Sequence, residues 1–161
     1  MIEKLISEMI TFDQGDPKRI QHFLKVHDLA RTIAVLEGMD EESLFILETA
    51  AVVHDIGIHI SEEKFGSCSG RCQEQEGPPL AEEMLGRLGF PEPVISRVSY
   101  LVGHHHTYRD IDGSDYQILV ESDFLVNLYE DNASQEAVSH ACRSVFRTET
   151  GIRFCREMFG L

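Results

Sequence analysis

The stretch Ala50-Ala51-Val52-Val53-His54-Asp55-Ile56-Gly57 ends an apolar helical run with an imidazole and a carboxylate side by side. Helical steps back from His54 reach Ala51, Ala50 and Leu47, so His54 lies on the apolar stripe that is expected to face the core. Burying a polar group without a partner costs about 1–3 kcal/mol, and burying an unpaired carboxylate costs more. Either hydrogen bonds within the core or a shared metal ion must compensate this cost.

Length and charge bound the classes of protein to consider. The 161 residues are expected to form a single domain, 1–161, large enough to bury about 70% of the surface that the unfolded chain exposes. With 28 acidic and 14 basic residues the formal charge is −14, which argues against nucleic-acid backbones and anionic membranes as partners. A small anionic substrate remains compatible with this charge, because a bound metal ion reverses the local field.

The hydropathy, the first residues and the cysteines of the sequence are those expected of a cytoplasmic protein. No segment approaches the ~20 apolar residues of a membrane span, and the first residues do not resemble a secretory leader. The four cysteines, at 68, 72, 142 and 155, are too scattered for a disulfide framework. Cys68 and Cys72 lack a second close pair that would complete a zinc site, so free thiols are expected, with a redox pair as the alternative.

Apolar residues recur at helical spacing through most of the chain. This spacing predicts helices over residues 2–12, 17–37, 40–54, 78–88, 91–102, 116–130, 134–146 and 149–158. Asp16-Pro17 and Asp40 are suited to begin helices, whereas Gly38 and Gly89 are suited to end them. Residues 61–77 lose the periodicity and are expected to be irregular. The predicted fold is an all-α, single-layered bundle with five or six principal helices.

Three residues that disfavour burial lie on the apolar stripes of three separate predicted helices. They are His27, His54 and Asp123, and Asp55 adjoins the second of them. Because a bundle core brings such stripes together, these four side chains are expected to share one metal ion. Neutral imidazole and ionised carboxylate suit Mn, Fe, Co, Ni or Zn.

The order His27, His54-Asp55, Asp123 resembles the HD-domain superfamily of metal-dependent phosphohydrolases, over residues 20 to 130 approximately. The resemblance implies that these four residues hold a divalent ion, with Asp55 in the catalytic centre. It also implies that a metal-bound water or hydroxide attacks a phosphate ester. A nucleotide or another small phosphorylated metabolite is the expected substrate, and the sequence leaves the oligomeric state open.

Some members of this superfamily hold a second metal ion through two further histidines, with the central aspartate as a bridge. The resemblance implies such a role here for His104 and His105, while His106 is expected to point elsewhere. The other histidine has no counterpart, and Glu76 is the expected replacement, with Glu74 or a merely solvated acidic loop as alternatives. A site with one ion is the corresponding alternative.

The binuclear branch often has lysine after the His-Asp-Ile-Gly motif, but Ile58 stands there in this chain, so that branch's substrate binding does not transfer directly. The candidate phosphate contacts are Arg31, His59, Lys64 and Arg71.

Two other functions fit the same pattern of ligands. A similar set of histidines and aspartates holds two irons in oxygenases that share the fold. A metal-containing module that senses a nucleotide without turnover is the other alternative. A serine nucleophile motif, a Walker loop and a dinucleotide glycine fingerprint are all missing from the sequence.

Overall fold

The computed structural model describes residues 1–66 and 69–161, and over these residues the secondary structure is helical throughout. The helices are α1 (Ile2–Phe12), α2 (Pro17–Leu36), α3 (Glu41–Val53), α4 (Ile58–Phe65), α5 (Gly70–Leu88), α6 (Glu92–Val102), α7 (Ser114–Glu130), α8 (Gln135–Ser144) and α9 (Glu149–Phe159). The all-α prediction is confirmed, with more helices than the five or six expected. Cys68, the partner of Cys72 in the predicted alternative of a redox pair, lies outside the described residues.

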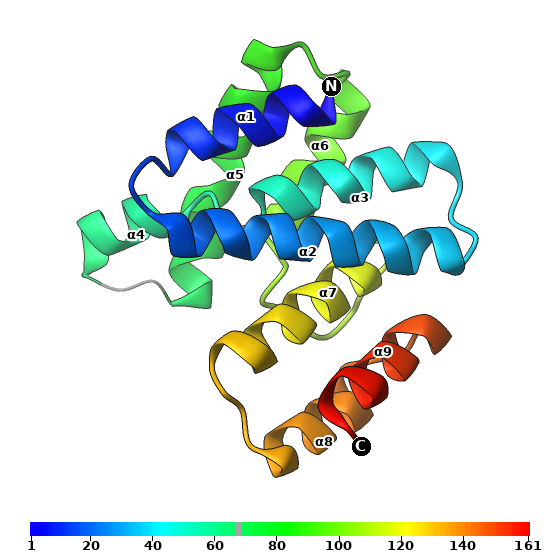
Figure 1. Cartoon of the computed structure of the whole chain (residues 1–161). Helices are drawn as coiled ribbons and strands as arrows, with labels where there is room; N and C mark the ends of the chain where they lie inside the picture. The colour runs from blue at the N-terminus through cyan, green and yellow to red at the C-terminus, as the bar shows by residue number, and fades with distance from the viewer. Residues whose placement is uncertain (67–68) are drawn as a thin grey trace.

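Helices α2, α3 and α7 form the centre of the molecule. Helix α2 packs against both α3 and α7, and α3 also packs against α6 and α7. Figure 1 shows α2 between α3 and α7, with α1, α5 and α6 on one side and α8 and α9 on the other. Residues 47–53 of α3 are all buried, so this helix is covered on every side over its last two turns. The continuous apolar run before His54 therefore belongs to a helix in the middle of the core.

Two predicted helix starts are confirmed in atomic detail. The Asp16 carboxylate accepts a hydrogen bond from the backbone N–H of Arg19, and Pro17 occupies the first turn of α2. The Asp40 carboxylate accepts one from the backbone N–H of Ser43 at the start of α3. Such caps satisfy backbone donors that have no partner inside the helix.

The segment expected to be irregular is largely helical. Helix α4 covers residues 58–65 and α5 begins at Gly70, so Pro78 and Pro79 lie inside α5 and do not start it. Proline interrupts the ladder of helical hydrogen bonds, which is why the sequence favoured a start there. Packing against α4 and α6 outweighs that cost. A Cβ atom on Gly57 would lie 2.8 Å from the backbone nitrogen of Gly77, so glycine permits this close approach.

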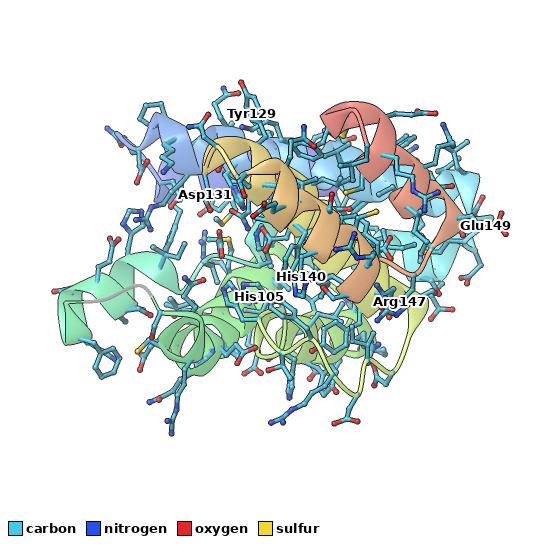
Figure 2. All side chains as sticks on the ribbon, turned by 90° about the horizontal axis from the view of Figure 1, so that it is seen from below. His105, Tyr129, Asp131, His140, Arg147 and Glu149 are labelled. Carbon is cyan, nitrogen blue, oxygen red and sulfur yellow. The ribbon has the colours of Figure 1, made fainter. Side chains whose placement is uncertain are left out.

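The C-terminal helices are fixed to α7 by a buried carboxylate. Glu121 of α7 accepts hydrogen bonds from the backbone N–H groups of Arg147 and Thr148, at 2.6 and 2.9 Å, and from the Thr148 hydroxyl. Figure 2, which looks onto α8 and α9, shows Arg147 and Glu149 at the turn between these two helices. Glu121 therefore holds this turn against the bundle.

One helical run, Glu41–Phe65, is long and apolar enough to cross a membrane when judged by length and composition alone. Residues 47–53 of this run, most of which are apolar, are all buried within the protein. Packing of the core is thus sufficient to explain this composition.

Candidate metal centre

Three helices bring four potential metal ligands to one point beneath the surface. His22 comes from α2, His54 follows the end of α3, and Asp123 comes from α7. The Nε2 atom of His22 lies 3.3 Å from Nε2 of His54 and 3.1 Å from Oδ1 of Asp123. Asp55 joins them, since its Oδ2 lies 3.4 Å from the same atom of His22 and 3.5 Å from Nε2 of His54.

Hydrogen bonds on the far side of each imidazole determine which nitrogen faces the cluster. The Nδ1–H of His54 donates to the Ala51 carbonyl at 2.9 Å, and that of His105 donates to the Val102 carbonyl at 2.8 Å. His22 donates its Nδ1–H at 2.9 Å to the carboxylate of Glu130, at the end of α7. With Nδ1 as the donor, Nε2 carries the lone pair that a metal ion requires.

A second group of potential ligands adjoins the first and shares Asp55 with it. Asp55, His105 and His106 offer ligand atoms within 4.8 Å of one another. The Oδ1 atom of Asp55 lies 3.4 Å from Nε2 of His105, while its Oδ2 faces His22 and His54. One carboxylate therefore presents an oxygen atom to each group. Gln73 of α5 accepts a hydrogen bond at 2.9 Å from Nε2 of His106.

Two further observations, an unpartnered nitrogen atom and the distances between ligand atoms, show that the site fits a divalent metal ion. The Nε2 atom of His105 is buried and has no hydrogen-bond partner in the described part of the chain, an arrangement that costs about 1–3 kcal/mol unless something binds there. Nitrogen and oxygen atoms bound to one ion at about 2.1 Å lie about 3.0–3.4 Å apart, which is close to the separations of 3.1–3.5 Å in the first group.

The charges in the metal-free cluster are strongly coupled. Burial lowers the pKa of His54, but the charge of Asp55 and the hydrogen bond to Asp123 outweigh it and raise the pKa to about 9. Burial likewise opposes ionisation of Asp55 and Asp123, yet the neighbouring histidines hold the pKa of each carboxylate well below its usual value. Each carboxylate is thus ionised, as a metal ligand must be.

A cleft of about 290 Å³ leads from the surface to these ligands. His22, Asp55, His106 and Asp123 form part of its wall, and Lys18 and Arg19 provide positive charge at the start of α2. The remaining lining residues are Asp16, Ile58, Gln73, Asn127 and Glu130. A small anionic molecule that entered the cleft would meet both cations and the cluster of ligands.

The family model named HD domain matches residues 19–147, which is most of the chain. The chain belongs to the HD-domain superfamily. This HD-domain protein is also similar to a solved structure, that of a predicted HD superfamily hydrolase from an uncultured Thermotogales bacterium. The TM-score is 0.65 at 25% sequence identity, and the match covers 99% of this chain and 83% of the other. No curated protein matches the chain. The superfamily is one of metal-dependent hydrolases.

The structure brings His54, Asp55, His105 and Asp123 together as expected, but it does not place His27 with them. The Nε2 atom of His27 donates to the Glu48 carboxylate of α3 at 3.0 Å, and His22 takes the expected place in the cluster. Helix α2 packs against both α3 and α7, and its buried positions form one stripe, with His27 at the edge of it. The helical spacing of His22, Val26 and Ala30 on that stripe is the signal in the sequence that indicates His22.

The second group also differs from the one expected for this HD-domain protein. His104 points away from it, stacks on the Tyr100 ring at 4.1 Å and donates to the Tyr100 carbonyl. His106 takes part instead, because α6 ends at Val102 and helical steps no longer apply to the turn that follows.

Both glutamates considered as replacements for a ligand serve other contacts. Glu76 pairs with Lys64 at 2.6 Å, outside the two groups. Glu74 accepts hydrogen bonds from the backbone N–H of His106 and from the Thr107 hydroxyl, both at 3.0 Å. The residue of α5 beside the ligands is Gln73.

The four expected phosphate contacts lie away from the cleft. Arg31 pairs with Glu48, His59 with Asp13, and Lys64 with Glu76, whereas Arg71 is exposed on α5. Since none of these four residues lines the cleft, Lys18 and Arg19 are the cations that sequence reasoning missed. Both precede His22 by about one helical turn, so they lie on the same side of α2 as this histidine.

Proposed function

We propose that this HD-domain protein is a phosphohydrolase that acts on a nucleotide or another small phosphorylated metabolite, in the cytoplasm. The observation that carries the proposal is the convergence of His22, His54, Asp55 and Asp123 at the floor of a cleft with cations at its rim. Cationic side chains bind phosphate oxygens, and the same cleft exposes ligands for a divalent ion.

Arg19 supports a phosphate substrate most directly. Its guanidinium is held by the carboxylates of Asp16 and Glu62, both at 2.8 Å. The Nη1 atom of Arg19 is nevertheless buried and without a hydrogen-bond partner in the described part of the chain. An oriented guanidinium with a spare donor, in the wall of the cleft, is suited to bind a phosphoryl oxygen. Exposed Lys18 would add charge at the entrance.

Each ligand residue would have a defined role. His22, His54, Asp55 and Asp123 would hold one ion, and Asp55 with His105 and His106 would hold a second. A divalent ion bound there would polarise the phosphoryl group and make a water molecule more acidic. Arg19 and Lys18 would bind and orient the phosphate.

The test is metal analysis of freshly purified protein, followed by a screen of phosphorylated metabolites for release of inorganic phosphate with Mn²⁺, Fe²⁺, Co²⁺, Ni²⁺ and Zn²⁺. We expect metal in the wild type, with turnover that is lost in Asp55→Asn. Arg19→Gln should keep its metal but raise KM about tenfold or more, because it loses a charged hydrogen bond to phosphate.

Arg31→Gln is the matched control, since Arg31 lies outside the cleft. Metal-loaded protein that releases no phosphate from any substrate in the screen would contradict the proposal. Intense colour together with oxygen consumption would instead indicate the di-iron oxygenase class.

A further inference from the structure

The segment that follows the buried histidines forms a second hollow beside the cleft. His106, Thr107, Tyr108 and Arg109 line this hollow, which has a volume of about 410 Å³. His106 also lines the cleft described above, so the two depressions meet at this residue. A molecule with its phosphate in the cleft therefore has an adjoining surface on which the rest of it can lie.

The backbone of this segment is fixed from two sides. Glu74 of α5 accepts hydrogen bonds from the N–H of His106 and the hydroxyl of Thr107. The buried Tyr116 hydroxyl lies within hydrogen-bond distance of the carbonyl oxygens of His104 and Thr107. The backbone that carries the following side chains is therefore ordered before any ligand binds.

Tyr108 presents an aromatic ring at this position. The ring packs edge-to-face on Phe124 of α7, with a centroid separation of 5.0 Å, and Phe124 is the neighbour of Asp123. The residue is still 48% exposed, and its hydroxyl has no hydrogen-bond partner among the described residues.

Arg109 adds a free positive charge beside this ring. Its side chain is exposed and makes no ion pair or hydrogen bond with the described part of the chain. Tyr108 and Arg109 also line a neighbouring polar hollow of about 250 Å³, and Arg147 lies in the wall of the same hollow. In a chain with a net charge of −14, an unpaired guanidinium next to an exposed ring is suited to a polar aromatic ligand.

We propose that Tyr108 and Arg109 form a leaving-group subsite. It takes the planar aromatic part of a phosphate ester, such as the base of a nucleoside monophosphate. Tyr108 stacks on the aromatic group, and Arg109 binds its polar edge. This inference rests on the proposed function, because it places the phosphate in the cleft. Stacking of a base on an aromatic side chain accounts for about tenfold or more in affinity.

The test compares adenosine monophosphate with glycerol 3-phosphate in the metal-loaded protein. Tyr108→Leu should raise KM for adenosine monophosphate about tenfold, leave KM for glycerol 3-phosphate unchanged, and leave kcat for both unchanged. Tyr108→Phe should retain most of the wild-type KM, because the ring remains. Tyr129→Leu is the control, since this tyrosine is 67% exposed and lines a different hollow. An equal change for both substrates, or none for either, would overturn the subsite.

Calorimetric titration of the same metal-loaded proteins with adenosine monophosphate separates this inference from the proposed function. Binding that is weakened in Tyr108→Leu, in a protein that releases no phosphate from any compound, supports the subsite and contradicts the phosphohydrolase. Phosphate release from other substrates without binding of adenosine monophosphate or any aryl phosphate supports the phosphohydrolase and overturns the subsite.

Discussion

The acceptor behind His22 differs in kind from those behind the other histidines of the cluster. His54 and His105 donate to neutral carbonyl groups, whereas His22 donates to Glu130, which in turn accepts from the Lys25 ammonium at 2.6 Å. Burial opposes ionisation of Glu130, but its hydrogen bond with Lys25 outweighs this and lowers its pKa. A carboxylate in this position fixes the tautomer and strengthens the imidazole as a ligand.

We therefore expect Glu130→Gln to weaken metal binding by about 10–100-fold, the usual effect of removing such a partner. Competition with a chromogenic chelator measures this affinity directly. Asp131→Asn, at the exposed neighbouring position, should bind metal as the wild type does. Equal affinity of Glu130→Gln and wild type would show that the ring of His22 is positioned without Glu130.

The two histidines of α2 provide a second prediction. His22→Ala should lose the ion of the first group, because it removes a ligand from the centre of that group. His27→Ala should keep the metal content of the wild type and lose at most about 1–3 kcal/mol of stability, through its contact with Glu48. Metal analysis and chemical denaturation of the two variants check both statements. Loss of metal from His27→Ala alone would reverse the assignment.

The packing of α5 depends on a close contact between its backbone and that of Gly57. A Cβ atom at position 57 would lie 2.8 Å from the Gly77 nitrogen and 2.9 Å from the Gln73 carbonyl oxygen. Gly57→Ala should lower the free energy of unfolding by about 1–3 kcal/mol, the usual cost of overpacking. In Gly86→Ala the new methyl group meets nothing within 4 Å, so this variant should gain about 0.5–1 kcal/mol. Urea denaturation of the metal-free proteins measures both changes.

Helical phase explains which parts of the site could be predicted from the sequence. His54, Asp55 and Asp123 could be predicted because α3 and α7 are buried along much of their length, so a polar residue within or just after these apolar runs lies in the core whatever the helical phase. The sequence predicts a helix that begins at Pro78, which places Glu76 just before it. Helix α5 in fact begins at Gly70, and its buried side carries Gln73 and Gly77. On α2 both histidines lie at or beside the apolar stripe, and the packing against α3 and α7 decides that His22 faces the cluster.

For the molecule as a whole, bound metal should act as a stabilising ligand. A ligand at a concentration of 100 times its Kd adds about 2.7 kcal/mol to the free energy of unfolding. At about 2–4 °C per kcal/mol for a protein of this size, the Tm should rise by about 5–10 °C on metal addition. Differential scanning calorimetry with and without chelator provides the measurement. His22→Ala is the control, and its Tm should rise less than that of the wild type, because only the second group of ligands remains intact.

The spread of the ligands along the chain has a consequence for biosynthesis. His22 and Asp123 are 101 positions apart, and both face the same point only after α7 has packed against α2 and α3. A nascent chain that has not yet extended past α7 lacks a ligand that the first group requires, however well its earlier helices have formed. Capture of an ion by the first group is therefore a late event in the maturation of each molecule, because it requires that α7 has already packed on the earlier helices.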